Sequence, residues 1–352
     1  MVTRSNLKIE KRIIGDNYKP FIIAEVGQAH EGKINKVYKY IDSISKTGVD
    51  AIKFQTHLAE EESTLDEPFR KNSNFNFKFK NRYEYWKSVE FNIDEWIKIK
   101  RYVEKKNLIF LSSVFSIKAA RMMKKIGIKA IKIGSGEFNS IDLINEIVKI
   151  KLPLLLSTGM VKLNEIEKLN KILVKKKAQF GFFQCTSAYP VKLEKVGINI
   201  ISELKKKFNC PIGLSDHSGT IYPSIFGISL NTNMLELHVK LDNDETGPDV
   251  TSSVNLKELK QVCEINDAVY LMRKNPINKK ILGKDIKKMR EIFGKSISLN
   301  KDFERGETIK KENILMKKPG TGFAYKDINK IIGKKTLRFV SKKRILKKSD
   351  IE

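Results

Sequence analysis

Short apolar runs alternate with longer stretches of helical spacing along most of the chain. The runs are rich in β-branched and aromatic residues, and eight of them follow in order: Phe21–Gly27, Ala51–Thr56, Leu108–Ser113, Ala130–Ser135, Pro153–Thr158, Phe180–Thr186, Ile212–Asp216 and Met234–Val239. Apolar residues recur every three or four positions after each run, as at Ile34, Val37 and Ile41 after the first. This alternation predicts parallel βαβ units. Eight such units favour an α/β fold closed into a (β/α)8 TIM barrel rather than an open sheet.

One connection in this pattern is much longer than the others. About 35 residues, rich in Asn, Phe, Lys and Tyr, separate the second apolar run from the helix predicted near Ile93–Val103. A loop of this length in a compact domain is usually functional. We therefore expect this segment to serve the site, for example as a lid.

The pattern changes after the helix predicted over Leu256–Met272. Ser296–Leu299 and Leu337–Ser341 are predicted as strands, and the turns ERGET and KPGTG lie between them. We therefore predict a barrel domain over residues 1–275, a linker over 276–290 and a small β-rich domain over 291–352. The last of these is too short to need an enzyme activity of its own.

The chain carries a formal net charge of +27 over 352 residues, and lysine supplies nearly all of the excess, with 57 Lys against 11 Arg. A charge of this size raises the question of nucleic acid. The lysines are spread along the whole chain, however, and no RNA- or DNA-binding signature accompanies them. We therefore do not expect nucleic acid as a partner, and a positive field also suits an anionic substrate.

The sequence contains no sign of a membrane segment or of a cysteine framework. No apolar stretch approaches the roughly 20 residues of a membrane span, and the N-terminus has no apolar signal core. We expect a cytoplasmic protein without a membrane partner. Cys185, Cys210 and Cys263 are widely spaced and form no CxxC pair, which indicates neither a zinc cluster nor a disulfide framework.

Polar residues gather at the carboxyl ends of the predicted strands, which share one mouth in a barrel. All four histidines of the chain, His30, His57, His217 and His238, fall in or just after such ends. We therefore expect all four at the mouth.

Two lysines lie inside predicted strands, each between apolar residues: Lys53 and Lys132. A buried charge without a partner costs several kcal/mol. One such lysine is explained by a structural ion pair, but two on separate strands indicate a bound anion. Lysine point charges and nearby hydroxyls suit a phosphate or a carboxylate.

His217 ends the seventh predicted strand and His238 lies in the eighth, so the two strands are neighbours in a barrel. Two neutral imidazoles directed at one point form a plausible divalent-metal pair, with water and substrate in the open positions. The alternative is that each is a hydrogen-bonded structural histidine. Glu25 and Glu137 are candidate acid/base groups, or else salt-bridge partners of the lysines.

These residues lie in sequence blocks that together resemble the N-acetylneuraminate (sialic acid) synthase family, which includes the legionaminic and pseudaminic acid synthases. Nine blocks carry the resemblance, in order: Ala24–Gly32, Ala51–His57, Phe110–Ser116, Ile131–Glu137, Leu156–Met160, Gln184–Pro190, Gly213–Thr220, Glu236–Asp242 and Gly247–Val254. The tail, with LNKDFERGET and KKPGTG, is similar to the family's antifreeze-like SAF (β-clip) domain. The resemblance extends from Phe21 to Glu352.

The resemblance implies a transferase that forms a carbon–carbon bond. Phosphoenolpyruvate adds through its C3 to the open-chain aldehyde of an N-acetylated amino sugar, either N-acetylmannosamine or a related diacetamido hexose. Water attacks C2 and phosphate leaves, which gives a nine-carbon 2-keto acid. A divalent metal activates the aldehyde; Mn²⁺ is the typical ion, with Mg²⁺ or Co²⁺ as alternatives.

The resemblance also implies roles for individual residues. Glu25, Glu137, His217 and His238 fall on catalytic positions, and the two histidines fall on the metal ligands. The phosphoenolpyruvate positions are Lys53, Ser113, Lys132, Ser135, Ser157 and Ser215. The sugar positions are Gln55, Tyr189, Asp249 and Lys318, the last of which replaces an arginine that is common in the family. A domain-swapped homodimer is implied, in which the small domain of one chain caps the barrel of the other.

Two other readings remain open at this point. One is a different phosphoenolpyruvate-condensing keto-sugar synthase, but such enzymes act on phosphorylated aldoses and lack the SAF tail. The other is a non-catalytic basic scaffold or binding protein. The presence of both histidines, both lysines and both glutamates argues against the scaffold.

Overall fold

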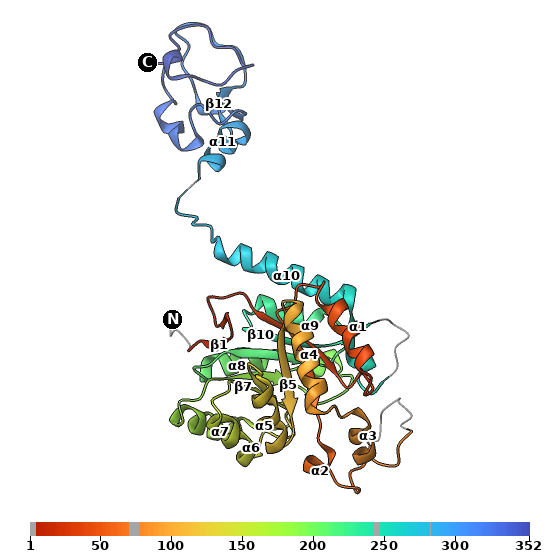
Figure 1. The fold of residues 1–352 in the computed structure, drawn as a ribbon. Coiled ribbons are helices and arrows are strands. Elements are labelled where there is room, and N and C mark those ends of the chain that lie inside the picture. Colours follow the sequence, from red (N-terminus) through yellow and green to blue (C-terminus); the bar gives the residue numbers. More distant parts are fainter. Residues whose placement is uncertain (1–4, 70–77, 242–246, 282) are drawn as a thin grey trace. The chain divides into compact units, whose positions relative to one another are not determined.

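The computed structural model describes residues 5–69, 78–241, 247–281 and 283–352 (Figure 1). The chain divides into two compact units, Met1–Lys274 and Asn275–Glu352. None of the helices in the described part of the chain combines the length and the apolar character needed to cross a bilayer.

The first unit is built around a closed parallel barrel. Its strands are β3 (Phe21–Gly27), β4 (Ala51–Thr56), β5 (Ile109–Val114), β6 (Ile131–Ile133), β7 (Leu154–Ser157), β8 (Phe180–Cys185), β9 (Ile212–Asp216) and β10 (Met234–Lys240). Each strand pairs in parallel with the next, and β10 pairs with both β9 and β3, which closes the ring. The predicted eight-stranded barrel is therefore confirmed. A short strand, β11 (Ser253–Asn255), pairs in parallel with β10 as well.

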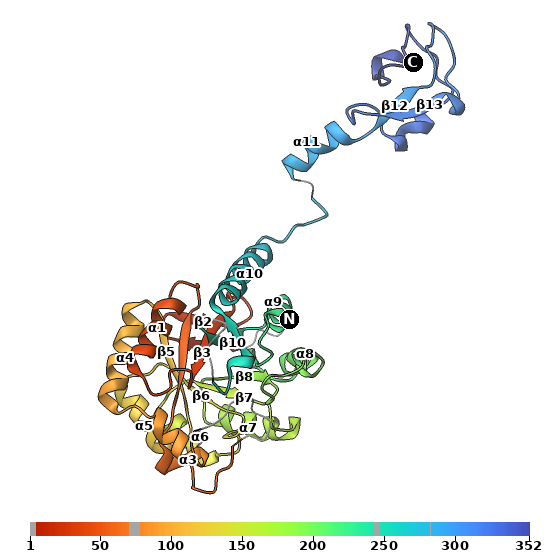
Figure 2. The ribbon, with the colours of Figure 1, turned by 90° about the vertical axis from the view of Figure 1, so that its right-hand side faces the viewer.

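Helices surround the barrel (Figure 2). Their apolar side chains are buried in one core with those of the strands. The helices are α1 (Ile34–Ile44), α4 (Ile93–Lys105), α5 (Ile117–Ile126), α6 (Ile141–Lys149), α7 (Leu163–Lys175), α8 (Ile198–Lys207), α9 (Tyr222–Ser229) and α10 (Leu256–Lys274). Local signals set their ends. Helix α4 begins at a capping box, in which the Asn92 side chain accepts the Glu95 N–H at 3.0 Å and the Glu95 carboxylate accepts the Asn92 N–H at 2.9 Å. Helix α5 ends at Gly127, whose left-handed backbone suits glycine.

The interior of the barrel changes from apolar to polar along each strand. Side chains alternate between the two faces of a strand, so every second residue points inward. The first inward positions, such as Phe21, Ala51 and Met234, belong to an apolar cluster that fills the barrel's amino-terminal half. The later inward positions on the same strands, Glu25, Lys53 and Glu236 among them, are charged yet buried. The carboxyl-terminal half is therefore where a ligand can be bound.

An N-terminal hairpin closes the amino-terminal end of the barrel. Its strands β1 (Leu7–Ile9) and β2 (Arg12–Ile14) pair antiparallel and precede the first barrel strand. Leu7, Ile9 and Ile14 are at most 1% exposed and belong to the same apolar cluster as the strand starts. The hairpin therefore extends the core beyond the strands themselves.

Two short helices lie in the long connection between β4 and α4: α2 (Ala59–Glu62) and α3 (Arg82–Val89). A small cluster formed by Ala59, Tyr85, Trp86 and Val89 packs them together. The predicted lid includes residues 70–77, which lie outside the described residues.

The second unit contains one helix, a two-stranded sheet and several 3₁₀ turns in its described part. Helix α11 (Lys284–Phe293) precedes strands β12 (Ser296–Leu299) and β13 (Ile314–Lys317), which pair antiparallel. The 3₁₀ turns are η3 (Lys311–Asn313), η4 (Tyr325–Lys330) and η5 (Lys348–Asp350), and two more, η1 (Leu193–Lys195) and η2 (Val250–Ser252), lie in the first unit. A small core that includes Ile297, Phe303 and Val340 holds the unit together.

Two expectations for this region differ from the structure. The strand predicted over Leu337–Ser341 does not form, because only Val340 is buried there and it makes an isolated bridge to Phe303 while Leu337 and Phe339 are exposed. The stretch predicted as a linker, residues 276–290, contains most of α11.

Glycines make room for the large side chains in the barrel interior, and this packing can be tested. A Cβ on Gly213 would lie 2.6 Å from ring atoms of Phe183, which is fully buried. We expect Gly213→Ala to lower the free energy of unfolding by about 1–3 kcal/mol, measured by urea denaturation, because an overfilled core must shift. Gly136→Ala is the matched control, since its Cβ would meet nothing closer than 3.6 Å. Equal stability of the two variants would contradict this packing.

Candidate functional site

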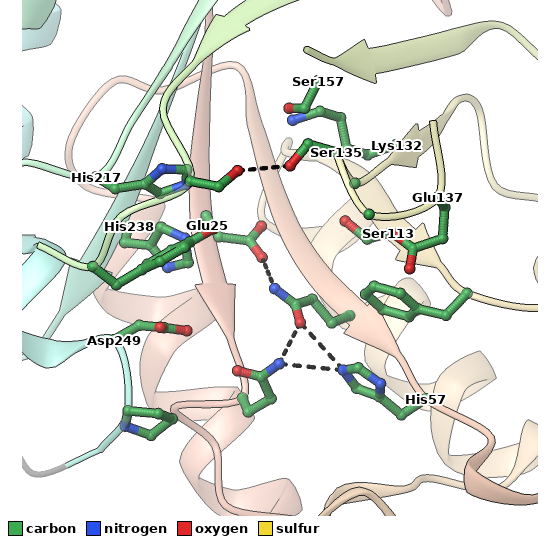
Figure 3. Close-up of a pocket in the computed structure, with 18 of the residues that line it drawn as sticks. Glu25, His57, Ser113, Lys132, Ser135, Glu137, Ser157, His217, His238 and Asp249 are labelled. Carbon is green, nitrogen blue, oxygen red and sulfur yellow. Dashed lines mark hydrogen bonds between the residues drawn. The ribbon is translucent and has the colours of Figure 1, made fainter. Parts of the chain in front are cut away.

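One cavity of about 440 Å³ lies at the carboxyl ends of the barrel strands. Thirteen of the fourteen residues predicted for the site line it: Glu25, Lys53, Gln55, Ser113, Lys132, Ser135, Glu137, Ser157, Tyr189, Ser215, His217, His238 and Asp249. Most of them are labelled in Figure 3. The remaining one, Lys318, belongs to the second unit, where its Nζ lies 5.3 Å from the ring centroid of Phe293. The structure thus gathers residues from all eight strands or from the loops that follow them.

A chain of alternating charges forms the floor of the cavity. Lys53 Nζ lies 2.6 Å from Glu25 Oε2 and 3.8 Å from Glu236 Oε2. Lys132 Nζ lies 2.7 Å from Glu236 Oε1, so Glu236 stands between the two lysines. All four side chains are at most 5% exposed. Each charge therefore has an opposite charge beside it, which is the condition under which buried ions are tolerated.

The protonation of these groups follows from burial and pairing. Burial alone would raise the pKa of Glu236, but Lys132 and Lys53 outweigh it and lower the pKa. Burial likewise opposes the charge on Lys53, yet Glu236 and Glu25 together raise its pKa. The pKa of Lys132 is lowered, chiefly by burial and also by the charge of Lys53, and the adjacent Glu236 carboxylate compensates in part. An anion bound at this point would stabilise the Lys132 ammonium further.

Hydroxyls and glycines surround the two lysines. Ser113 Oγ accepts a hydrogen bond from Lys53 Nζ at 2.9 Å, and Ser215 Oγ donates to Glu236 Oε1 at 3.0 Å. The hydroxyls of Ser135 and Ser187 lie 2.8 Å apart. A Cβ on Gly159 would come within 2.6 Å of the Ser187 hydroxyl, so glycine keeps this wall open. The small polar wall leaves room for an anion beside the ammonium groups.

His217 and His238 face one another across 5.3 Å between their ring centroids. The Nδ1 of His217 lies 3.1 Å from the carbonyl oxygen of Thr186, which can only accept, so Nδ1 carries the hydrogen and Nε2 keeps its lone pair. Burial and the neighbouring His238 lower the pKa of His217 to about 3. A neutral ring oriented by a backbone carbonyl is the form in which histidine binds a metal.

The pair fits a divalent metal as two of its ligands. Within residues 5–69, 78–241, 247–281 and 283–352, no group of three or more His, Cys, Asp or Glu side chains converges in the manner of a metal site. Asp216, the last residue of β9 and the neighbour of His217 in the chain, is turned to the loop that follows and accepts the Ser218 hydroxyl at 2.7 Å. Water or substrate would therefore have to supply the remaining ligands.

His30 does not line the cavity, so the expectation that all four histidines lie at the mouth is wrong for this residue. Its ring packs 4.9 Å from Phe91 between centroids, and its Nδ1 accepts the N–H of Gly32 at 3.1 Å. Burial lowers its pKa to about 3. The loop after β3 turns this ring into the layer between strands and helices, where it stabilises the turn.

His57 lines the cavity at the end away from the two other histidines (Figure 3). Its ring stacks between Trp86 and Phe115, with centroid distances of 4.0 and 4.4 Å. Its Nδ1 lies 2.5 Å from Glu62 Oε1, and its Nε2 lies 3.2 Å from Gln55 Oε1. Gln55 in turn donates to Glu25 Oε1 at 3.0 Å, so a hydrogen-bonded chain connects the ion pairs of the floor to the segment after β4.

Glu137 lies in the turn after β6, opposite the histidine pair (Figure 3). Burial raises its pKa to about 7, and Glu62 and Glu67 add to the rise. A carboxyl group with such a pKa is present in both protonation states near neutral pH, as a general acid or base requires.

Several residues of the site were not assigned a role from the sequence. Glu236 is the most important, because it pairs with both lysines. Its signal is visible in the strand MLELHVK, where Glu and His alternate with apolar residues on one face. Glu62, Glu67, Arg82 and Trp86 come from the long connection after β4 and had no regular spacing to reveal them.

Known proteins of similar sequence match this chain along nearly its whole length. The N,N'-diacetyllegionaminic acid synthase of Campylobacter jejuni is 28% identical to it, over 90% of this chain and 95% of the relative. The N-acetylneuraminate-9-phosphate synthase of Homo sapiens is 29% identical, over 93% and 91%.

A solved structure extends this agreement to three dimensions. The sialic acid synthetase of Leptospira borgpetersenii, in complex with citrate, matches with a TM-score of 0.71 at 28% identity, covering 82% of this chain and 95% of that one. The model of the NeuB family matches residues 40–277, which is more than half of the chain. The fold, the site and the relatives therefore lead to one assignment, and this chain belongs to the NeuB family.

Proposed function

We propose that the chain condenses phosphoenolpyruvate with an N-acetylated amino sugar, such as N-acetylmannosamine or a related diacetamido hexose, and releases phosphate. The product is a nine-carbon 2-keto sugar acid of the sialic acid type. The observation that carries the proposal is the pair of buried lysines, surrounded by hydroxyls, in the same cavity as two neutral imidazoles. The names of the relatives support it.

Phosphoenolpyruvate is a compact, multiply charged anion, and the lysine end of the cavity suits it. Lys53 and Lys132 provide the positive charge, and Ser113, Ser135, Ser157 and Ser215 provide hydroxyl donors. Because both ammonium groups are already held by carboxylates, they are fixed before the substrate arrives. Such preorganisation lowers the cost of ordering the site on binding.

The remaining residues are proposed to serve the sugar and the proton transfers. Gln55, Tyr189 and Asp249 would hold the sugar so that its aldehyde carbon meets C3 of phosphoenolpyruvate. Glu137, in its protonated form, would donate a proton to the aldehyde oxygen as the new bond forms. Glu25 would orient the water that attacks C2, after which the C–O bond to phosphate breaks.

A divalent cation, Mn²⁺ with Mg²⁺ or Co²⁺ as alternatives, would be held by His217 and His238 and would supply Lewis-acid polarisation of the aldehyde. Neutral imidazoles favour its binding, because metal and proton compete for the same lone pair.

Two further expectations stay proposals. The second unit is proposed to be an SAF domain that reaches the barrel of a partner chain in a domain-swapped homodimer, with Lys318 contacting the sugar there. Lysine offers a point charge where an arginine would offer a planar fork, so its contact would be less directional. We also propose that the protein acts in the cytoplasm.

The proposed reaction can be tested with the full-length chain, Mn²⁺, phosphoenolpyruvate and a panel of N-acetylated amino sugars. We expect phosphate release that depends on both substrates and a product whose mass equals a nine-carbon keto acid. Lys132→Met should lower kcat/KM on the order of 100-fold or more, because a buried charge that meets the anion is lost. Lys129→Met, at an exposed lysine outside the cavity, is the matched control. No phosphate release with any sugar, together with tight heparin binding at moderate salt, would favour the basic scaffold instead.

The metal ligands can be tested separately from the fold. We expect His238→Ala to lose metal-dependent turnover while its thermal unfolding stays cooperative, because the ring lies at the cavity wall. His30→Ala should behave in the opposite way, with metal dependence kept and stability lowered, since that ring is packed outside the cavity. Turnover by His238→Ala at the parental rate in chelator-treated buffer would contradict the assignment.

The raised pKa of Glu137 predicts a stability change with pH. Above about pH 7 the folded chain carries a buried carboxylate there, whereas the unfolded chain titrates near 4.5, so this group's contribution to stability falls as pH rises between these values. We expect Glu137→Gln to match the parent at pH 4 and to be about 2 kcal/mol more stable at pH 8, measured by urea denaturation. The kcat of the parent should fall as pH rises through about 7, because Glu137 then loses the proton that it is proposed to donate. A constant stability difference from pH 4 to pH 8 would show that the carboxyl is not perturbed by burial.

A further inference from the structure

The end of the cavity away from the lysines is walled by the connection between β4 and α4. Glu62, Glu67, Arg82 and Trp86 of this segment line the cavity, together with Glu137 across from them. The hydrogen-bonded chain from Glu25 through Gln55 and His57 to Glu62 gives the order of groups along the cavity. When an anion is bound to the lysines, this end of the cavity remains open to the second substrate.

The charges of this wall are paired with one another. Glu62 contacts His57 at 2.5 Å, and its second carboxylate oxygen accepts the backbone N–H of Leu58 at 3.3 Å. Glu67 contacts Arg82 at 3.0 Å, and it also accepts the indole N–H of Trp86 at 3.0 Å. Arg82 is therefore a cation that already holds a carboxylate.

The balance of charge at this end is negative. Among the described residues that line the cavity, Glu25 and Glu236 pair with Lys53 and Lys132 at the lysine end. The opposite end has three carboxyl groups, those of Glu62, Glu67 and Glu137, and one lining lysine or arginine among the described residues, Arg82. The raised pKa of Glu137, which comes first from burial and then from Glu62 and Glu67, agrees with a negative field at the opposite end.

We propose that the acceptor is an amino sugar that carries no phosphate, because the carboxylates around its end of the cavity repel a second phosphate group. This inference rests on the proposed condensation and names the class of its acceptor. Carboxylates that face an uncharged sugar accept hydrogen bonds from its hydroxyl and amide groups. The same carboxylates beside a phosphate dianion are like charges in a partly enclosed site, an arrangement that is strongly disfavoured.

Two of the relatives differ in whether the name of the product includes a phosphate. The Homo sapiens relative is named for a 9-phosphate product, whereas the name of the Campylobacter jejuni relative contains no phosphate. Phosphoenolpyruvate contributes three carbons, so a phosphate on C9 of the product comes from C6 of the acceptor. The two kinds of acceptor therefore differ at the part of the sugar farthest from the new bond.

The test compares uncharged N-acetylated amino sugars with N-acetylmannosamine 6-phosphate, using the full chain with Mn²⁺ and phosphoenolpyruvate. We expect an uncharged sugar to be preferred on the order of 100-fold in kcat/KM, because like charges placed together in an interface are strongly disfavoured. Higher ionic strength should narrow the preference, since salt screens the repulsion. Equal or better turnover of the 6-phosphate would overturn the inference and leave the condensation standing. No phosphate release with any acceptor would overturn both.

Two variants, each of which removes one negative charge, test whether the residues of the β4–α4 connection cause the preference for an uncharged sugar. Glu67→Gln keeps the shape of the side chain and releases Arg82, so the preference for the uncharged sugar should fall on the order of tenfold. Glu61→Gln removes the same charge from the same segment, but Glu61 is exposed, pairs with Lys118 and does not line the cavity. Its preference should equal that of the parent. A preference unchanged in Glu67→Gln, or reduced equally in both variants, would contradict the role of the wall.

Discussion

Four charged side chains in the barrel interior, Glu25, Lys53, Glu236 and Lys132, are the interaction on which the rest of the site depends. Each is almost completely buried, and each has a neighbour of opposite sign. Removing one partner would leave an uncompensated charge in a low-dielectric interior, which is far more costly than removing the whole set. The apolar layer below them and the hydroxyls around them are arranged about this row.

The barrel was predictable because its signal is periodic. A buried strand such as Ala51–Thr56 is apolar on both faces except where an inward residue reaches the cavity, so Lys53 and Gln55 mark both the strand and its function. The strands of the N-terminal hairpin have only three residues each, too few for a period to show. Helix α11 does have apolar residues at helical spacing, Ile286, Met289 and Phe293, but the expected linker covered most of it. Residues Leu337–Ser341 show the converse error, in which alternation without a second buried position does not form a strand.

The members of the site were more predictable than their contacts. Position at a strand end brings thirteen predicted residues to one cavity, because barrel geometry does so whatever the side chain. Glu236 could be seen on its strand, but its pairing with lysines from two other strands depends on distances across the barrel. His30 has the same kind of position as the other histidines, and only the course of its loop turns it away. Glu62 and Arg82 follow no period at all.

The N-terminal hairpin limits the ways in which molecules can enter and leave the barrel. With Leu7, Ile9 and Ile14 sealed into the apolar layer, the barrel is a blind-ended well rather than a tunnel. Its lysines are 3% exposed, whereas Arg82 and Glu67 are each 29% exposed, so the anion-binding end is the deeper one. A molecule seated first at the shallow end would stand in the path of the other. In the proposed condensation, the small anion would therefore have to enter before the bulkier sugar.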